Sequence, residues 1–225
     1  IIVDAPTGVR GRQLRGWLER NNVTTSLRKT DDPEGRALLA KHGLDANRLP
    51  VVELYDGTTL VDPGEVELAE ALGANTHPMQ NRYDVAIVGA GPAGLAAAVY
   101  AGAEGLRALL VEQDAVGGQA GTSSKIRNYL GFPWGVHGGE LAERANRQAA
   151  ALGAEVVVPR NAVGLRTEGS DRVVTLSSGD EVTASTVVIA GGVTYRRLGV
   201  AAVDALIGVG VFYGAAPSET SSMGG

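Results

Sequence analysis

Three glycines, Gly89, Gly91 and Gly94, are spaced as G-x-G-x-x-G. They follow a short Val-rich apolar run, residues 83–88, and precede an Ala-rich stretch, residues 95–103, so the pattern predicts a strand, a tight turn and a helix. In this setting the first glycine permits the turn, the second lets the backbone approach a pyrophosphate, and the third lets the helix lie against the strand. The motif indicates a dinucleotide site, although a strand-to-helix turn without a ligand would use the same residues.

The start of the expected helix and the next strand strengthen this interpretation. Pro92 stands at the first helical position, where a missing N–H costs nothing, and free N–H groups such as that of Ala93 face the phosphates. About twenty residues on, a second predicted strand, residues 107–111, ends at Glu112. A carboxylate there can accept hydrogen bonds from both ribose hydroxyls of an adenosine and would repel a 2′-phosphate. We therefore expect FAD or NAD at this site rather than NADP.

The composition limits the classes of partner. The chain has 225 residues, 44% of them hydrophobic, with a net charge of −5, which argues against nucleic acid or an anionic membrane surface. No apolar run approaches the ~18 residues that span a bilayer, and we expect a cytoplasmic location. The absence of cysteine excludes disulfides, a Cys metal site and dithiol catalysis within these residues.

Residues 1–75 are expected to form a unit of their own. Apolar periodicity and turn residues predict, in order, a strand at 1–3, a helix at 9–20, a strand at 23–27, a helix at 33–40, paired strands at 49–60 and a helix at 65–72. This order resembles the thioredoxin and glutaredoxin fold, with Pro50 where that family has its cis-proline. Residues 7–10 replace the Cys pair of that family, so a redox role in its usual form is excluded. A role in docking or substrate positioning and a role as a retained packing module are the two interpretations that remain.

A polar segment with a proline, residues 76–82, is the expected linker to a second unit, residues 83–207. There a long polar loop, residues 113–133, follows Glu112 and offers amides and hydroxyls that could bond the polar edge of a flavin ring. Alternation over 163–188 predicts a three-stranded meander. The expected fold class is α/β: a truncated thioredoxin-like domain followed by an incomplete Rossmann-type FAD-binding domain with a β-meander.

The second unit resembles the low-molecular-weight thioredoxin reductase family. Gly117-Gly118-Gln119 matches its G-G-Q segment, Asn128 and the following Tyr keep part of its E-N-[WY]-P-G segment, and Ala190-Gly191 stands at its A-T-G strand end. The resemblance implies FAD, with NAD(P)H expected in the complete protein. The expected cofactor-binding residues are Gly89, Gly91, Pro92, Ala93, Gly94, Glu112, Gly118, Gln119, Thr122, Asn128, Ala190 and Gly191.

The family's redox-active Cys pair has no counterpart here. Gly214 and Pro217 stand at the two cysteine positions, and disulfide reduction needs sulfur at both. The chain is more similar to a cysteine-free subgroup of thioredoxin-reductase-like flavoproteins that carries an upstream thioredoxin-like domain. Both ends look truncated, and residues 208–225 are expected to begin a connection to a missing NAD(P)H-binding domain.

The expected function is that of an FAD-dependent oxidoreductase that takes hydride from NAD(P)H to flavin and passes electrons to an unknown external acceptor. Since the cofactor would carry the chemistry, we name no catalytic side chain and no metal site. The alternative is a redox-inactive flavin-binding or interaction module that couples an upstream regulatory domain to a partner; a third reading has no cofactor at all. The expected partners are a nicotinamide nucleotide and the electron acceptor, and a homodimer stays open.

Overall fold

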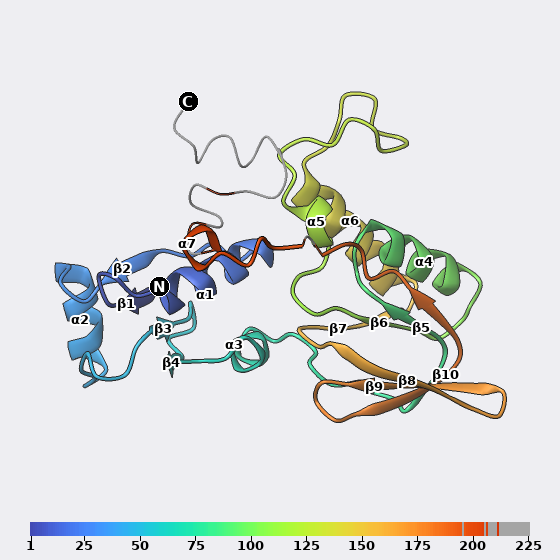
Figure 1. The fold of residues 1–225 in the computed structure, drawn as a ribbon, viewed down its shortest axis with the longest axis horizontal. Helices are drawn as coiled ribbons and strands as arrows, with labels where there is room; N and C mark the ends of the chain where they lie inside the picture. Colours follow the sequence, from blue (N-terminus) through green and yellow to red (C-terminus); the bar gives the residue numbers. More distant parts are fainter. Residues whose placement is uncertain (195, 205, 207–210, 212–225) are drawn as a thin grey trace.

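The structure, a computed structural model, describes residues 1–194, 196–204, 206 and 211 (Figure 1). It contains two sheets with helices packed against them, which confirms the α/β class. Figure 1 shows the first sheet with α1 and α2 at one side of the molecule and the second sheet with α4 and α6 at the other. The expected connection at residues 208–225, including Gly214 and Pro217, lies outside the described residues apart from Val211.

The first sheet has the strand order β2-β1-β3-β4, with β1 parallel to β2, and with β1–β3 and β3–β4 antiparallel. The expected β-α-β-α-β-β-α order is confirmed, and the Leu49–Pro50 peptide bond is cis. The elements are β1 (Ile2–Asp4), α1 (Arg10–Arg20), β2 (Leu27–Lys29), α2 (Pro33–Lys41), β3 (Val51–Glu53), β4 (Thr59–Val61) and α3 (Glu65–Ala71).

The second strand begins later than predicted. Residues 23–27 were expected as a strand, but pairing with β1 starts at Leu27 and ends at Lys29. The backbone N–H of Val23 donates to Leu18 O and so belongs to the turn that closes α1. The β-branched residues at 23–25 favour extended backbone, but these residues have no neighbouring strand to pair with.

The turn where thioredoxins carry their Cys pair is organised around a buried carboxylate, that of Asp4. Its Oδ2 accepts from the N–H of Gly11 at 2.7 Å, and its Oδ1 accepts from that of Ala5 at 2.8 Å. A Cβ added at Gly8 would lie 2.1 Å from Asp4 Oδ2. The chain's own carboxylate thus fills the place at the start of α1 where an anion could bind.

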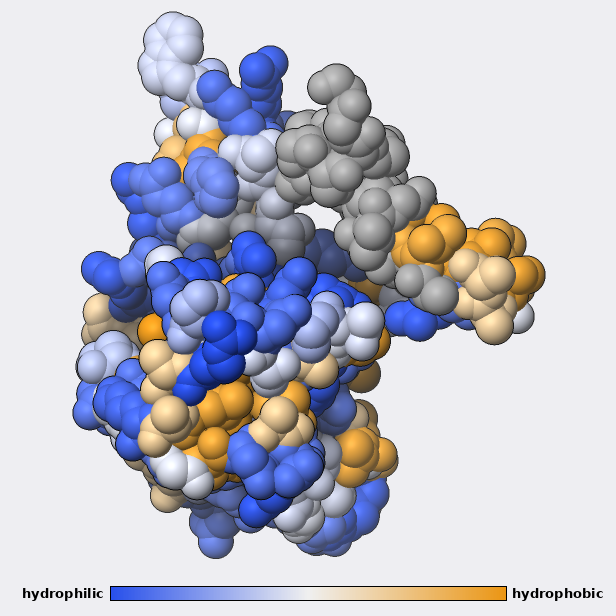
Figure 2. All heavy atoms as spheres, turned by 90° about the vertical axis from the view of Figure 1, so that its left-hand side faces the viewer, coloured by the Kyte–Doolittle hydropathy of each residue, from blue (hydrophilic) through white to orange (hydrophobic). Residues whose placement is uncertain are grey.

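The outer surface of this part of the molecule is seen in Figure 2, where hydrophilic residues predominate and apolar residues lie between them.

Leu14, Trp17 and Leu18 form the inward face of α1 and are buried against β1, β3 and α3. These three residues are spaced for one helical face, as the sequence predicts.

The second sheet has the order β7-β6-β5-β10-β9-β8. β7, β6, β5 and β10 are mutually parallel, and β10, β9 and β8 form the antiparallel meander that the sequence predicts. The elements are β5 (Arg82–Val88), α4 (Pro92–Ala103), β6 (Ala108–Val111), α5 (Gly118–Gly121), α6 (Gly138–Ala151), β7 (Glu155–Val157), β8 (Ala162–Glu168), β9 (Asp171–Leu176), β10 (Glu181–Ile189) and α7 (Ala201–Asp204).

Both faces of the parallel strands are covered. Along β6, Ala108 and Leu110 pack with α4 and α6, whereas Leu109 and Val111 pack in a cluster with the meander. Because successive side chains of a strand point to opposite faces, a strand covered on both sides needs apolar residues at every position. This explains why the sequence there is a continuous apolar run and not an alternating one.

The segment between the two sheets is hydrogen-bonded to the second one. The Val158 N–H donates to Asn75 O at 3.0 Å. The buried carboxylate of Glu155 accepts from Asn75 Nδ2 at 2.9 Å, from the Met79 N–H at 2.7 Å and from the Tyr83 hydroxyl at 2.6 Å. Burial and then the bond to Glu155 raise the pKa of Tyr83. The expected linker is therefore held against Glu155, the first residue of β7, through Met79.

No helix among the described residues has the length and apolar character needed to cross a membrane.

Candidate functional site

Strand register brings the predicted site residues to one edge of the second sheet. Val88, the last residue of β5, pairs with Val111 at the end of β6 and with Ile189 at the end of β10. Because these strands are parallel, the residues that follow them leave the sheet at the same edge. Ligands of open α/β sheets bind outside the carboxyl ends of the strands.

Two glycines of the loop after β5 are required by the fold. Gly89 has φ 102°, and a Cβ there would lie 2.4 Å from Ala190 O. A Cβ at Gly94 would lie 1.8 Å from Gly89 O, so only glycine lets α4 pack this closely on the strand. These are the turn and close-packing roles that the spacing of the motif predicts.

Gly91 is different, because no atom of the described residues lies within 4 Å of a Cβ added to it. It caps the N-terminus of α4 with φ −71° and ψ −177°, which any residue can adopt. Among the described residues, the backbone N–H groups of Ala93 and Gly94 have no acceptor, and the start of a helix carries partial positive charge. The loop therefore presents an open surface with N–H donors, the chemistry that suits a phosphate group.

Glu112 lies directly behind this loop. Its side chain is buried, with Oε2 accepting from the Ala90 N–H at 2.7 Å and Oε1 accepting from the Asp114 N–H at 2.9 Å. A carboxylate has about four acceptor positions, so each oxygen keeps further capacity. Glu112 thus fixes the glycine loop to the end of β6 and retains lone pairs for hydroxyl groups.

A second glycine turn completes one side of the site. The Gly117 N–H donates to Ala90 O at 2.8 Å, and a Cβ at Gly118 would lie 3.4 Å from Gly91 Cα. Gly117 has φ 104°, and a Cβ there would lie 2.4 Å from Ala142 Cβ. Our sequence interpretation placed Gly117 in the G-G-Q segment but did not include it among the expected cofactor-binding residues. It also missed Ala90, which acts through its backbone and leaves no signal in the side chain.

The end of β10 forms the other side. The Ala190 N–H donates to Val88 O at 2.8 Å, and Gly191 Cα would lie 3.2 Å from a Cβ on Gly89. In the part of the chain that the structure describes, no atom lies within 4 Å of a Cβ added at Gly191. Gln119 Nε2 donates to Val193 O at 2.9 Å and so joins α5 to the chain that follows Gly191.

The two remaining predicted residues, Thr122 and Asn128, lie in the segment between α5 and α6, residues 122–137, called the excursion below. Thr122 Oγ1 donates to Gln119 O at 2.9 Å and is thereby occupied within its own turn. Asn128 is exposed, and its side chain has no hydrogen-bond partner among the described residues. The structure thus gathers the glycines, Glu112, Gln119 and Ala190 at the sheet edge and leaves Asn128 in solvent.

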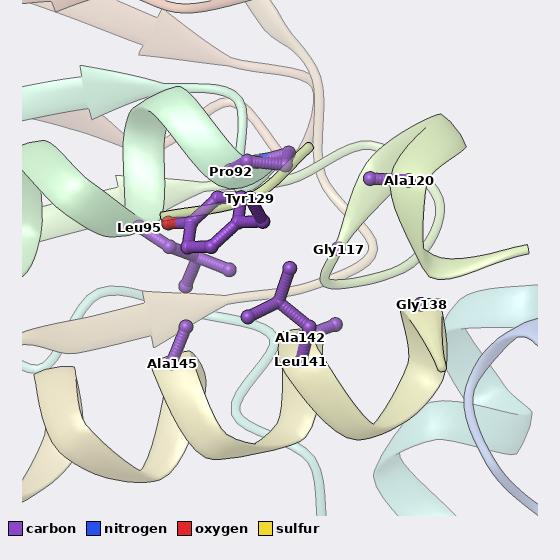
Figure 3. Close-up of a pocket in the computed structure, with 9 residues that line it drawn as sticks. All are labelled: Pro92, Leu95, Gly117, Ala120, Tyr129, Gly138, Leu141, Ala142 and Ala145. Carbon is purple, nitrogen blue, oxygen red and sulfur yellow. The ribbon is translucent and has the colours of Figure 1, made fainter. Parts of the chain in front are cut away.

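Tyr129, which the sequence interpretation did not select, lies beside the start of α4. Its ring lies next to Pro92 and Leu95 and faces Leu141 and Ala142 of α6 (Figure 3). Together they line a narrow apolar crevice between the two helices. The aromatic residue after Asn128 was a visible feature of the sequence, but nothing in the sequence showed that it would reach α4.

The site contains no cluster of metal-ligating side chains: among the described residues no three His, Cys, Asp or Glu side chains are grouped to hold a metal ion. His137 near the excursion caps α6, with Nδ1 accepting from the Gly139 N–H at 3.2 Å. What the edge of the sheet offers is backbone donors, a buried carboxylate and apolar surface.

A family model described as "Pyridine nucleotide-disulphide oxidoreductase" matches residues 83–215, more than half of the chain. The chain belongs to this family. The match starts with β5 and includes the glycine loop, Glu112 and the end of β10, so the sheet edge described above is the family's part of the molecule. Membership also confirms the resemblance to thioredoxin-reductase-like flavoproteins that the sequence indicates.

Several members of this pyridine nucleotide-disulphide oxidoreductase family are similar to the chain. The thioredoxin reductase of Treponema pallidum (strain Nichols) is 39% identical over 137 residues, which cover 60% of this chain and 43% of that protein. The thioredoxin reductase of Bacillus subtilis (strain 168) is 36% identical over 131 residues, covering 58% and 40%. The crystal structure of T. acidophilum thioredoxin reductase aligns with a TM-score of 0.53 at 30% identity, covering 58% of this chain and 42% of that one. The chain spans less than half the length of these relatives.

The residues at the site of this family member fit a dinucleotide. A methyl group at Gly91 or Gly191 would point into open space and not into protein. The start of α4, next to Gly91, presents backbone N–H donors that have no acceptor among the described residues. Glu112 is hydrogen-bonded to Ala90 of the glycine loop. Such an edge can hold a diphosphate by its backbone and a ribose by a carboxylate.

Proposed function

We propose that the chain is the FAD-binding part of an oxidoreductase that takes hydride from NAD(P)H to flavin. The electrons then pass to an external acceptor and not to an internal dithiol. In this proposal residues 83–207 form the FAD-binding domain, residues 1–75 form a thioredoxin/glutaredoxin-like domain without its Cys pair, and residues 76–82 join them.

The observation that carries the proposal is the contrast among the three loop glycines. Gly89 and Gly94 are needed for the fold, whereas packing leaves Gly91 free, so the motif contains one glycine more than the turn requires. A close approach of a ligand to the backbone explains that glycine. The adjoining N–H groups of Ala93 and Gly94 would then donate to the diphosphate.

The other site residues divide along the length of the cofactor. Glu112 would accept from the ribose hydroxyls of the adenosine, since each of its oxygens accepts only one backbone bond. Gly118, Ala190 and Gly191, which lie against the loop, would allow the backbone to approach the cofactor. Gln119, Thr122 and Asn128 would serve the flavin end.

The composition of the chain bears on the electron acceptor, which stays unknown. Its 225 residues contain no cysteine, so they supply no thiolate to accept electrons from a flavin. Bound FAD supplies the redox chemistry, accepting a hydride and releasing electrons to a second reactant. The protein's part is to bind and orient the cofactor, to shield it from water and to leave room for the two reactants.

Anaerobic mixing of the purified, FAD-loaded full-length protein with NADPH and, separately, with NADH tests this function. Rapid loss of the visible absorption band of oxidised flavin with either nucleotide is the expected result. Free FAD at the same concentration is the control for unassisted reduction. A yellow protein that neither nucleotide bleaches would contradict the proposal and favour the redox-inactive flavin-binding module.

A further inference from the structure

We infer that the N-terminal unit is part of the dinucleotide site, with Arg20 as a residue that positions Glu112 for the adenosine ribose. This inference rests on the proposed binding of FAD. It assigns to residues 1–75 a role in holding the cofactor that does not need the missing Cys pair.

The contact between the two units falls beside Glu112. Arg20, at the end of α1, donates from Nε to Asp114 Oδ2 at 2.8 Å and from Nη2 to Asp114 Oδ1 at 3.0 Å. The Asn21 side chain donates to Asp114 O at 3.3 Å and to Trp17 O at 2.9 Å. A paired guanidinium–carboxylate contact fixes orientation as well as distance.

From Asp114 the contact continues into the cofactor site. The Asp114 N–H donates to Glu112 Oε1, and Glu112 Oε2 accepts from the N–H of Ala90 in the glycine loop. A continuous series of hydrogen bonds and covalent bonds thus runs from α1 to the loop that would hold the diphosphate. Because each oxygen of Glu112 is held by one donor, a shift of Asp114 would turn the carboxylate.

The end of α1, which carries Arg20, is held in place by packing. Trp17 and Leu18 on its inner face are buried in the core of the first unit. Asn75, the last residue of that unit, is hydrogen-bonded to Glu155 at the start of β7 and to Val158 directly after it. Arg20 is therefore presented from a packed helix and not from a free arm.

A cleft of about 1200 Å³ lies at the same boundary. One wall comes from α1, including Gln13 and Trp17, and the other from residues 113–114 after β6 and 159–161 after β7. Its lining includes Asp114 and Gln113, which follow Glu112 in the chain, and it is large enough for a nucleoside.

Affinity for FAD tests the inference. Arg20→Ala removes the paired contact, and since the ion pair is partly exposed, with side-chain exposures of 41% and 44%, we expect about a two- to fivefold rise in the Kd for FAD. Arg20→Lys should restore only part of the affinity because a lysine cannot make the paired contact. Arg15→Ala is the matched control: Arg15 lies on the same helix and pairs with Glu19, and its loss should leave the Kd unchanged.

A double-mutant cycle separates positioning from general loosening. If Arg20 acts through Glu112, adding Arg20→Ala to a Glu112→Gln protein should not raise the Kd for FAD further. If Glu112→Gln folds poorly, Asp114→Ala serves as the background in its place. The Kd for ADP, which carries the adenosine and diphosphate alone, should rise by the same factor in Arg20→Ala. Equal FAD affinity in Arg20→Ala and wild type overturns the inference and leaves the proposed function intact. A wild-type protein that binds no FAD overturns both.

Discussion

Replacing Gly91 with alanine separates the ligand-binding glycine from those that the fold requires. In the protein the new methyl meets no atom within 4 Å. Alanine is a poorer N-cap than glycine but restricts the unfolded chain more, and these two effects oppose each other within about 1 kcal/mol. We therefore expect the free energy of unfolding to change by less than about 0.5 kcal/mol.

The effect on the cofactor should be much larger. The methyl would occupy the surface that a diphosphate approaches and would move the phosphate away from the N–H donors of Ala93 and Gly94. A hydrogen bond to a charged group is worth about 1.5–3 kcal/mol, so losing one weakens FAD binding about ten- to a hundredfold.

Two further variants show that the effect is local. Gly64 caps α3 with φ −75° and also has no atom within 4 Å of an added Cβ. Gly64→Ala therefore repeats the capping change at the start of a different helix, away from the glycine loop, and should leave FAD binding unaltered. Gly94→Ala forces a Cβ to within 1.8 Å of Gly89 O and should lower stability by about 1–3 kcal/mol or more.

Thermal unfolding of the apoprotein and titration with FAD, followed by flavin fluorescence, measure both quantities on each variant. An unchanged FAD Kd in Gly91→Ala would show that the diphosphate does not lie on this loop. A melting temperature for Gly91→Ala as low as that of Gly94→Ala would show that the space above Gly91 is not open.

Three further predictions concern stability. Gly16→Ala in the interior of α1, where the nearest neighbour of the new Cβ is Arg20 Nη1 at 3.5 Å, should stabilise the protein by about 0.5–1 kcal/mol in urea unfolding. Hydrogen bonds from Arg107 lower the pKa of Asp84 from 3.8 to about 2. The ionised Asp84 therefore stabilises the fold above pH 3.8, and this stabilisation is lost as the pH falls toward 2. The difference in the free energy of unfolding between wild type and Asp84→Asn should shrink over that range. Glu155→Ala leaves the buried Tyr83 hydroxyl without its acceptor and should cost about 1–3 kcal/mol by chemical denaturation, whereas Glu155→Gln, which keeps an acceptor oxygen, should cost less.

Local patterns were sufficient to predict most elements of the fold. The three glycines between the apolar run 83–88 and the Ala-rich run 95–103 predict a strand, a turn and a helix, and the structure has β5, the loop and α4 there. The strand predicted at 23–27 was wrong because extended backbone needs a partner strand, and β1 offers one only from Leu27. Pairing is a property of two segments and is invisible in either alone.

The candidate site was predictable to the extent that its residues act through type and spacing. Glycines at tight turns and a carboxylate directly after a strand can be recognised in the sequence from residue type and position. Tyr129 and Asp114 leave none, because their roles depend on which helix or loop lies opposite. Asn128 shows the reverse: its identity suggested a contact, and in the structure its side chain is exposed.

The sequence by itself determined the alternation of strands and helices, the glycine loop, the carboxylate at Glu112 and the lack of any thiol. Each follows from the conformational freedom or chemistry of one residue and its near neighbours. Only the tertiary structure decided that parallel register sets Glu112 beside Ala90, and that Arg20, far away in the chain, reaches Asp114. Such contacts depend on how whole sheets and helices pack, because burying their apolar faces fixes which distant side chains meet.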